Sequence, residues 1–293
     1  MYVNNKFKNS VFTMLFHDPD LLRELYCALE GVSLSPDVPV YINTLENVLF
    51  MDFNNDISFE IAGKLVVLIE HQSTINPNMA VRLLIYFTRV IEKMVKGNAL
   101  YSKKEISIPY PEFYVLYNGT YPFPDEQILK LSDLYEKPQD IGLPEKASPL
   151  LELEVRVINI NEGRNRDIAD RCKKLAEYSA FIAKVREFGD KAENLKEAVK
   201  KAVKYCQKHD ILEKFLETHG SEVLNMLTLE WNTEDAIAYA REEGREEGRE
   251  EGFERLITTA RNALAKGIST ETVQEITGLD REVIEQLSNE GTI

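Results

Sequence analysis

Two short strand-like runs, residues 57–61 and 65–69, lie on either side of a turn; apolar and polar residues alternate in the first, and the second is apolar throughout. Alternation with a period of two predicts β-strands with one buried face. If the loop is 62–64, residues pair across the hairpin when their numbers sum to 126. One face is then wholly apolar and consists of Ile57, Phe59, Ile61, Leu65, Val67 and Ile69. The other face is the mixed one and includes the polar residues Asp56, Ser58, Glu60, Glu70 and Gln72.

A two-residue turn, Gly63-Lys64, is the alternative for this hairpin. It places Asp56 opposite His71 and turns the two acids, Asp56 and Glu70, to different faces, because a slip of one residue reverses every side chain of a strand. The consistency of the apolar face favours the three-residue loop, which is a normal hairpin connection when it contains glycine.

The rest of the first two thirds of the chain alternates between helix and strand patterns. Asp18-Pro19-Asp20 is typical of a helix start and Gly31 of its stop. Asn76-Pro77 predicts a helix that runs to about residue 95. Further strands are expected at 112–117, ended by Asn118-Gly119, and at 150–160, because β-branched and aromatic residues dominate there. Five prolines in 120–149 predict a connecting loop with a short helix at most.

From about residue 166 onward the pattern is helical in every window. A β-rich part followed by a helical part predicts an α+β fold. We expect one domain over residues 1–190 and an all-helical C-terminal region over residues 191–293.

Near the end of the chain, the tetrapeptide Arg-Glu-Glu-Gly occurs three times in succession, in residues 241–252. A period of four is nearly one helical turn, so the glycines form a slowly spiralling stripe. Each glycine costs a helix about 1 kcal/mol relative to alanine, and close approach of a second helix along the stripe would offset that cost. The segment is therefore either an oligomerising helix or a flexible, partly helical linker.

The last segment, residues 267–287, has the outline of a helix, a glycine-containing turn and a second helix. A DNA-reading version carries cations on its second helix. This second helix offers Arg281 against Asp280, Glu282 and Glu285, which favours a structural helical hairpin over a DNA reader.

Composition narrows the classes of function. The net charge of −14 argues against a generally basic nucleic-acid-binding surface, although a local basic patch remains compatible with it. The three cysteines are isolated, which argues against structural zinc and against a disulfide framework and fits a cytoplasmic compartment. Neither a signal peptide nor a run of about 18 apolar residues is apparent, so no membrane span is expected.

Two carboxylates are the candidate chemistry of the hairpin. In the favoured register Asp56 lies directly opposite Glu70, with Cβ atoms about 5 Å apart. Carboxylates this close repel unless something neutralises them, and a magnesium ion that retains several waters does so. Such an ion would activate water and polarise a phosphodiester, and Gln72 on the same face could orient the water or the phosphate. The alternative is a pair of solvated acids. His71 faces the other side and is expected to be packed or hydrogen-bonded.

The helix after the hairpin carries a polar, cationic stripe, because Arg82, Tyr86, Arg89 and Lys93 recur at intervals of four, three and four. Its apolar face consists of Met79, Leu83, Phe87, Val90 and Met94. If this helix packs beside the acids, the stripe could meet DNA phosphates. An ordinary solvated face is the alternative.

Several segments together resemble the recombination-promoting nuclease/putative transposase family, which belongs to the restriction-endonuclease-like PD-(D/E)xK superfamily. The segments are Asn55-Asp56-Ile57-Ser58-Phe59, Leu68-Ile69-Glu70-His71-Gln72-Ser73-Thr74-Ile75-Asn76, Arg82-Leu83-Leu84-Ile85-Tyr86 and Tyr114-Val115-Leu116-Tyr117-Asn118-Gly119.

This resemblance implies a mixed sheet flanked by helices and metal-dependent cleavage of DNA. It implies that Asp56 and Glu70 hold the metal, which would be magnesium, with manganese or calcium as alternatives. Gln72 falls where the superfamily carries its catalytic lysine, so turnover would be slow unless Arg82 or another cation substitutes for it. Arg82, Tyr86 and Arg89 are the candidate substrate-binding residues.

The leading hypothesis is therefore a magnesium-dependent DNA endonuclease, homo-oligomeric through its C-terminal helices, that serves recombination, mobile elements or defence against foreign DNA. A second hypothesis is a catalytically weak or inactive family member that acts as a DNA-binding or regulatory oligomeric module. A third is a structural helical-assembly protein with neither metal affinity nor contact with nucleic acid.

Overall fold

The computed structural model describes residues 11–43, 57–95, 97–144, 148–192 and 194–290 of the chain. The chain divides into two compact units, and the boundary lies between Thr228 and Leu229. The boundary expected from the sequence, at 190/191, lies inside the first unit, because the helix that follows it packs against the helix that precedes it. The first unit contains the sheet, and the second is helical.

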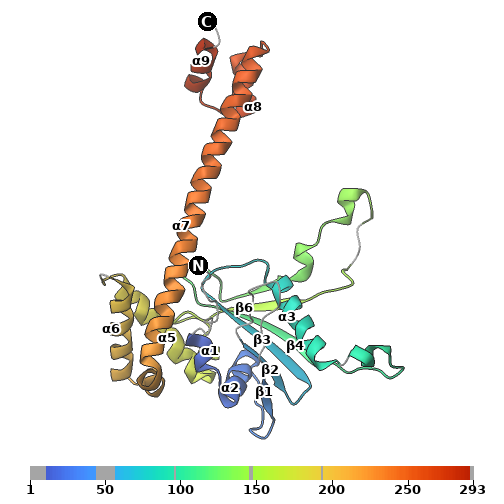
Figure 1. The fold of residues 1–293 in the computed structure, drawn as a ribbon, viewed down its shortest axis with the longest axis vertical. Helices are drawn as coiled ribbons and strands as arrows, with labels where there is room; N and C mark the ends of the chain where they lie inside the picture. The colour runs from blue at the N-terminus through green and yellow to red at the C-terminus, as the bar shows by residue number, and fades with distance from the viewer. Residues whose placement is uncertain (1–10, 44–56, 96, 145–147, 193, 291–293) are drawn as a thin grey trace. The chain divides into compact units, whose positions relative to one another are not determined.

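The sheet of the first unit has six strands among the described residues, in the order β1-β2-β3-β4-β6-β5 (Figure 1). Their bounds are β1 Val40–Ile42, β2 Ile57–Ile61, β3 Leu65–Gln72, β4 Tyr110–Tyr117, β5 Glu126–Lys130 and β6 Glu154–Asn159. The three central strands β3, β4 and β6 are parallel, and the outer strands are antiparallel to their neighbours. The predicted α+β fold with a mixed sheet is confirmed.

The hairpin register predicted from the alternation is confirmed for the described pairs. Ile57 pairs with Ile69 and Ile61 with Leu65, so paired numbers sum to 126. The three-residue turn closes with a hydrogen bond of 3.0 Å from the Lys64 amide to the Ile61 carbonyl. Ala62 and Gly63 take positive φ angles of 52° and 64° to make it. The pairing predicted for Asp56 falls outside the described residues.

Helices cover both faces of the sheet (Figure 1). The apolar hairpin face lies under helices α1 (Val11–Leu15), α2 (Pro19–Glu30) and α5 (Lys173–Gly189). Asp18 caps α2 as predicted, with its Oδ1 accepting from the amides of Asp20 and Leu21, and Gly31 ends this helix with a φ of 67°.

The opposite, mixed face is also buried, under helix α3 (Met79–Met94). The core there joins three strands to α3 and includes Val66, Leu68, Val115, Val157, Met79, Leu83 and Val90. The predicted start of this helix at Asn76-Pro77 is two residues early. Asn76 instead forms a turn, in which its Oδ1 accepts a 2.9 Å hydrogen bond from the Asn78 amide, and the competing local bond delays the helix.

The segment 120–149 differs from the predicted loop. It contains the edge strand β5 and two short 3-10 helices, η2 (Leu131–Leu134) and η3 (Pro138–Ile141). Strand β5 escaped the sequence reading because most of its residues are exposed, which leaves no alternating pattern. Strand β6 is shorter than the predicted 150–160. A further 3-10 helix, η1 (Gly97–Tyr101), follows α3.

The helical part begins where predicted. After α4 (Arg166–Arg171) and α5 come α6 (Leu195–Lys208) and the 53-residue helix α7 (Glu213–Ala265). The Arg-Glu-Glu-Gly repeat lies inside α7, so its backbone is helical. Helices α8 (Thr270–Thr277) and α9 (Arg281–Glu290) flank a turn in which Gly278 has a φ of 67°, as the helix-turn-helix outline predicted. Their small core consists of Ala260, Val273, Leu279, Ile284 and Leu287.

None of the helices in the described ranges is long and apolar enough to cross a membrane.

Candidate functional site

The carboxylate of Glu70 lies near the carboxyl end of β3, on the face covered by α3. Its side chain is only 3% exposed, and Oε2 lies 3.1 Å from Nη2 of Arg82. A carboxylate in such a place is costly to bury unless a charge and hydrogen bonds compensate it. The first turn of α3 therefore supplies the cation that pairs with this buried carboxylate.

Arg82 also contacts other predicted site residues. Its Nη2 donates to the Tyr86 hydroxyl at 3.2 Å, and its guanidinium lies 5.9 Å from the centre of the Tyr86 ring. The sulfur of Met79 lies 3.6 Å from Arg82 Nη1 and 2.9 Å from Nε2 of Gln72. The structure thus brings Glu70, Gln72, Arg82 and Tyr86 together around Met79.

The predicted cationic stripe of α3 does not act as one surface. Tyr86 is 3% exposed and belongs to the core under the sheet. Arg89 instead points to solvent and pairs with Glu92 at 2.6 Å, with 45% of the arginine side chain exposed. Helical spacing places Arg82, Tyr86 and Arg89 along one side of α3. This line of residues runs from the buried side of the helix to the exposed side, so only its N-terminal part reaches Glu70.

Ser58 is a buried hydroxyl on the same face as Glu70. It pairs with Leu68, which makes it a diagonal neighbour of Glu70 on the adjacent strand. The residue is 3% exposed, and its Oγ has no hydrogen-bond partner among the described residues. Buried hydroxyl groups normally have a hydrogen-bond partner. A hydroxyl without one beside a buried carboxylate therefore indicates that packing alone does not explain the polar residues in this part of the sheet.

The ends of the three parallel strands form a second polar group, which the sequence reading missed. The Asn118 amide donates to the Gln72 carbonyl at 2.8 Å and so ties the end of β4 to the end of β3. Arg186 of α5 donates to Oδ1 of Asn118 and to Oδ1 of Asn161, each at 2.9 Å, and to the Asn118 carbonyl at 2.6 Å. Arg186 therefore joins the turns after β4 and β6.

The glycine of this turn has a steric role. A Cβ atom at Gly119 would lie 2.0 Å from the carbonyl oxygen of Ser73, a distance that no side chain tolerates. The turn thus presses directly on the chain that leaves β3 after Gln72. Asn118-Gly119 was readable in the sequence as the end of a strand, but its contact with Ser73 was not, because the two segments are 45 residues apart in the chain.

A comparison with protein families matches residues 15–213 to the family described as "Putative transposase, YhgA-like". That span covers more than half of the chain. The chain belongs to this family. Searches of curated proteins and of solved structures found no match.

Membership of the YhgA-like transposase family points to a role in transposition or recombination. The matched residues include Glu70, Gln72, Arg82, Asn118 and Arg186, and they end at the start of α7. The Arg-Glu-Glu-Gly repeat and the helical hairpin therefore lie outside the part that defines the family.

His71 of this YhgA-like protein lies on the sheet face opposite Glu70, as predicted. Its ring stacks on Phe12 with a centroid distance of 4.9 Å and an interplanar angle of 13°. Its Nε2 lies 3.1 Å from the Tyr178 hydroxyl. Burial, and secondly the charge of Arg186, lowers the pKa of His71 to about 4. The residue is a neutral, packed histidine, and this geometry gives it no access to a metal at Glu70.

The donor chemistry around Glu70 fits a magnesium-like ion, because carboxylate and hydroxyl oxygens are the ligands that such ions take. Within the described ranges, however, no three acid, histidine or cysteine side chains gather into a metal-binding group. Glu70 and its neighbour Ser58 are oxygen donors of the kind that such an ion takes, and the predicted second acid, Asp56, lies outside those ranges.

A cavity of about 210 Å³ lies elsewhere, between the loop after β6 and helices α4 and α5. It is lined by residues 160–165, Ile168, Ala169, Leu175, Ala176, Ser179 and Ala180. None of the residues around Glu70 lines this cavity. The candidate functional site is therefore the group of Glu70, Gln72, Arg82 and Tyr86 on β3 and α3.

Proposed function

We propose that this chain is a divalent-metal-dependent DNA endonuclease that serves transposition, recombination or defence against foreign DNA. One observation carries the proposal. Glu70 is a buried carboxylate that forms an ion pair with Arg82. It lies on β3, which ends at Gln72, and all three residues belong to the segment that matches a transposase family. Buried charged groups with paired partners concentrate at functional sites.

In the proposed site Glu70 and Asp56 would hold the metal. When bound, a divalent ion lowers the pKa of a water molecule and polarises the scissile phosphoryl oxygen. The side chain of Gln72 would orient the attacking water or a phosphate oxygen through its amide.

Arg82 takes the role of the cation that the superfamily lysine supplies elsewhere. Its guanidinium is held by Glu70 and Tyr86 at 3.1 and 3.2 Å, so its orientation is set before substrate arrives. A preorganised cation stabilises negative charge that develops on the phosphoryl group. Tyr86 is buried and so would position Arg82, whereas Arg89, whose side chain is 45% exposed and pairs with Glu92 at the surface, would contact the DNA backbone.

The experiment is plasmid cleavage by the full chain in magnesium, manganese or calcium, and in a chelator. We expect metal-dependent nicking or linearisation that is lost in Asp56→Ala and in Glu70→Gln. Glu154→Gln, an exposed acid on β6 that pairs with Lys130, is the matched control and should cleave like the parent protein. Cleavage that persists in both site variants would contradict the proposal.

A second candidate function is a weak or inactive family member that binds DNA as a regulatory oligomer. Its support is that Arg82 already neutralises Glu70 and that Gln72 brings no positive charge. Retained DNA binding without cleavage in any of the three metals would favour this function.

In both cases we propose that α7 pairs with a second copy through its glycine stripe. Light scattering on the full chain, compared with a variant in which Gly244, Gly248 and Gly252 are replaced by glutamine, tests that assembly.

A further inference from the structure

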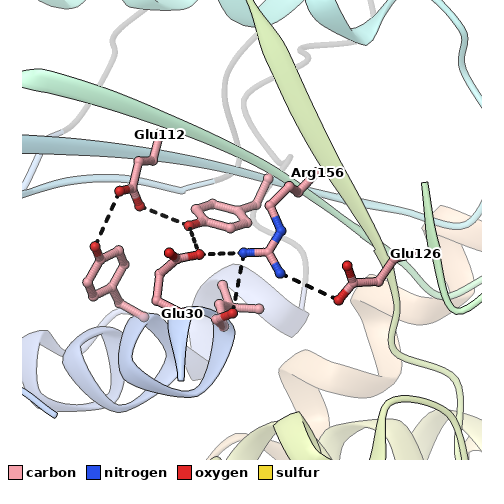
Figure 2. A network of polar contacts seen from close by, with 7 residues as sticks. Glu30, Glu112, Glu126 and Arg156 are labelled. Carbon is pink, nitrogen blue, oxygen red and sulfur yellow. Dashed lines mark hydrogen bonds and ion pairs between the residues drawn. The ribbon is translucent and has the colours of Figure 1, made fainter. Parts of the chain in front are cut away.

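A polar network joins α2 to the sheet on the face opposite Glu70 (Figure 2). It contains three carboxylates, two phenols and one guanidinium. The groups come from α2 (Tyr26, Glu30), β4 (Glu112, Tyr114), β5 (Glu126) and β6 (Arg156). With all three carboxyls ionised, three negative charges would face one positive charge, so the network as drawn lacks a compensating cation or proton.

The guanidinium of Arg156 forms its ion pairs with Glu30 and Glu126, not with Glu112. Its Nη1 pairs with Oε1 of Glu30 and lies 3.4 Å from the carbonyl of Leu29 in the last turn of α2. Its Nη2 lies 3.4 Å from Oε1 of Glu126. Glu112 has no ion pair among the described residues, and its hydrogen bonds are with the two phenols.

The hydroxyl of Tyr114 decides where the missing proton lies. Its oxygen is 2.7 Å from Oε1 of Glu30 and 2.8 Å from Oε2 of Glu112. A phenol carries one hydrogen and can donate it to one carboxylate. The other contact would join two unprotonated oxygens at hydrogen-bond distance, which is repulsive. Because Oε1 of Glu30 already accepts from Arg156, the hydrogens balance when Glu112 is a neutral acid that donates to Tyr114 while Tyr114 donates to Glu30.

Burial acts in the same direction as this hydrogen count. Burial raises the pKa of Glu112, and the charge of Glu30 raises it further, whereas the hydrogen bonds of Tyr114 and Tyr26 and the charge of Arg156 lower it. Burial also raises the pKa values of Tyr26 and Tyr114, so both phenols keep their hydrogen.

We propose that Glu112 is a proton-dependent latch, which as a neutral acid holds α2 on the sheet and on losing its proton loosens that contact. The groups that face it are Tyr26 and Glu30 of α2, Tyr114 of its own strand and Arg156 of β6. Farther out, Cys27 of α2 acts on Tyr26, and Glu126 of β5 lies beyond Arg156. When Glu112 ionises, it competes with Glu30 for the one hydrogen of Tyr114, and the two carboxylates repel each other.

The direction in which pH changes the stability of the α2 contact follows from the raised pKa of Glu112. A group whose pKa is higher in the folded state stabilises that state at low pH, and the contribution is lost as pH rises through the folded pKa. The latch is therefore closed in acid and opens toward higher pH, opposite to an ordinary carboxylate salt bridge. It does not depend on the proposed cleavage of DNA.

Hydrogen exchange of the α2 amides, measured against pH and corrected for intrinsic rates, tests the latch. In the parent protein we expect exchange of α2 to rise by up to about tenfold for each pH unit between the ordinary carboxyl pKa and the raised folded pKa of Glu112, and to level off above it, while α6 shows no such rise. Glu112→Gln should abolish the rise, because its amide donates to Tyr114 at every pH. Glu154→Gln, an exposed acid paired with Lys130 on the same sheet, is the control and should keep the parent profile.

Carbon-13 NMR of labelled glutamate carboxyl groups gives a direct readout on the unaltered protein. The Glu112 signal, identified by its loss in Glu112→Gln or its shift in Tyr114→Phe, should titrate at higher pH than the exposed glutamates. A Glu112 carboxyl that ionises together with the exposed glutamates would overturn the proposal, as would equal α2 exchange profiles in the parent protein and Glu112→Gln.

Discussion

Nη2 of Arg82 lies 3.1 Å from Oε2 of Glu70, and this ion pair fastens the first turn of α3 to the end of β3. The carboxylate is almost fully buried, whereas 24% of the arginine side chain is exposed. The pair therefore has one side in the core and one side accessible to a ligand. Its geometry suits a cation that both stabilises the fold and acts on a substrate.

Replacing Arg82 by alanine should slow cleavage much more than it weakens binding. Loss of a preorganised donor to a developing charge typically costs about 10²–10³ in turnover, while a single phosphate contact costs far less in affinity. Plasmid cleavage at saturating DNA and equilibrium binding in calcium measure the two effects separately. Arg89→Ala is the matched control on the same helix and should change affinity slightly and turnover little. Equal losses of turnover and affinity in Arg82→Ala would show that the residue only binds.

The same substitution should also destabilise the protein, because it leaves Glu70 buried without its cation. Removing one partner of a buried ion pair costs about 3 kcal/mol, the lower end of the usual range since Arg82 is partly exposed. Urea unfolding measures this cost. The double variant Arg82→Met with Glu70→Gln should recover part of the loss, and a double variant less stable than both single variants would contradict the pairing.

Gly119→Ala should be among the most damaging small substitutions in the chain. The new methyl group would meet the carbonyl oxygen of Ser73 at 2.0 Å, and the backbone cannot move aside without breaking the bond between Asn118 and Gln72. We expect a loss of about 3 kcal/mol, as for severe overpacking. Gly97→Ala, which has open space around its Cβ position, is the control. Thermal unfolding of both variants checks the contrast, and similar midpoints would refute it.

His71 should make the protein less stable in mild acid. Its pKa is lowered to about 4 in the folded state, against 6.5 for the free side chain. The stabilising contribution of the neutral ring is complete above 6.5 and is lost as pH falls from 6.5 through 4. The full difference amounts to about 3 kcal/mol. His71→Phe, which can still stack on Phe12, should flatten the stability profile in this window, whereas the exposed His17→Gln should not.

The two buried thiols should resist alkylation in the folded protein. Burial raises the pKa of Cys172 to about 12 and that of Cys206 to about 11, and the thiolate is the reactive form. Mass spectrometry after iodoacetamide treatment at pH 8 should find Cys27, which is partly exposed, modified first. Denaturant should make all three react at similar rates. Rapid labelling of Cys172 in the native protein would be inconsistent with this packing.

Local signals predicted much of the fold. The β2–β3 register followed from a period of two and a glycine turn, because only one register puts Ile57, Phe59 and Ile61 on the same face as Val67 and Ile69. The limits of α2 followed from Asp18 and Gly31, because capping is a contact between neighbours in the chain. The change to helices near residue 166 followed from their periodicity. Each of these features depends on residues a few positions apart, so the sequence alone contained it.

The composition of the candidate site was decided by tertiary structure. Helical spacing placed Arg82 and Arg89 in one stripe, but the rotation of α3 against the sheet turned Arg82 toward Glu70 and Arg89 toward solvent. The contacts of Arg186 with Asn118 and Asn161 join segments that are 68 and 25 residues distant in the chain. Such contacts depend on how elements pack in three dimensions, and the energy that selects one packing is shared among many weak interactions. No short stretch of sequence carries that information.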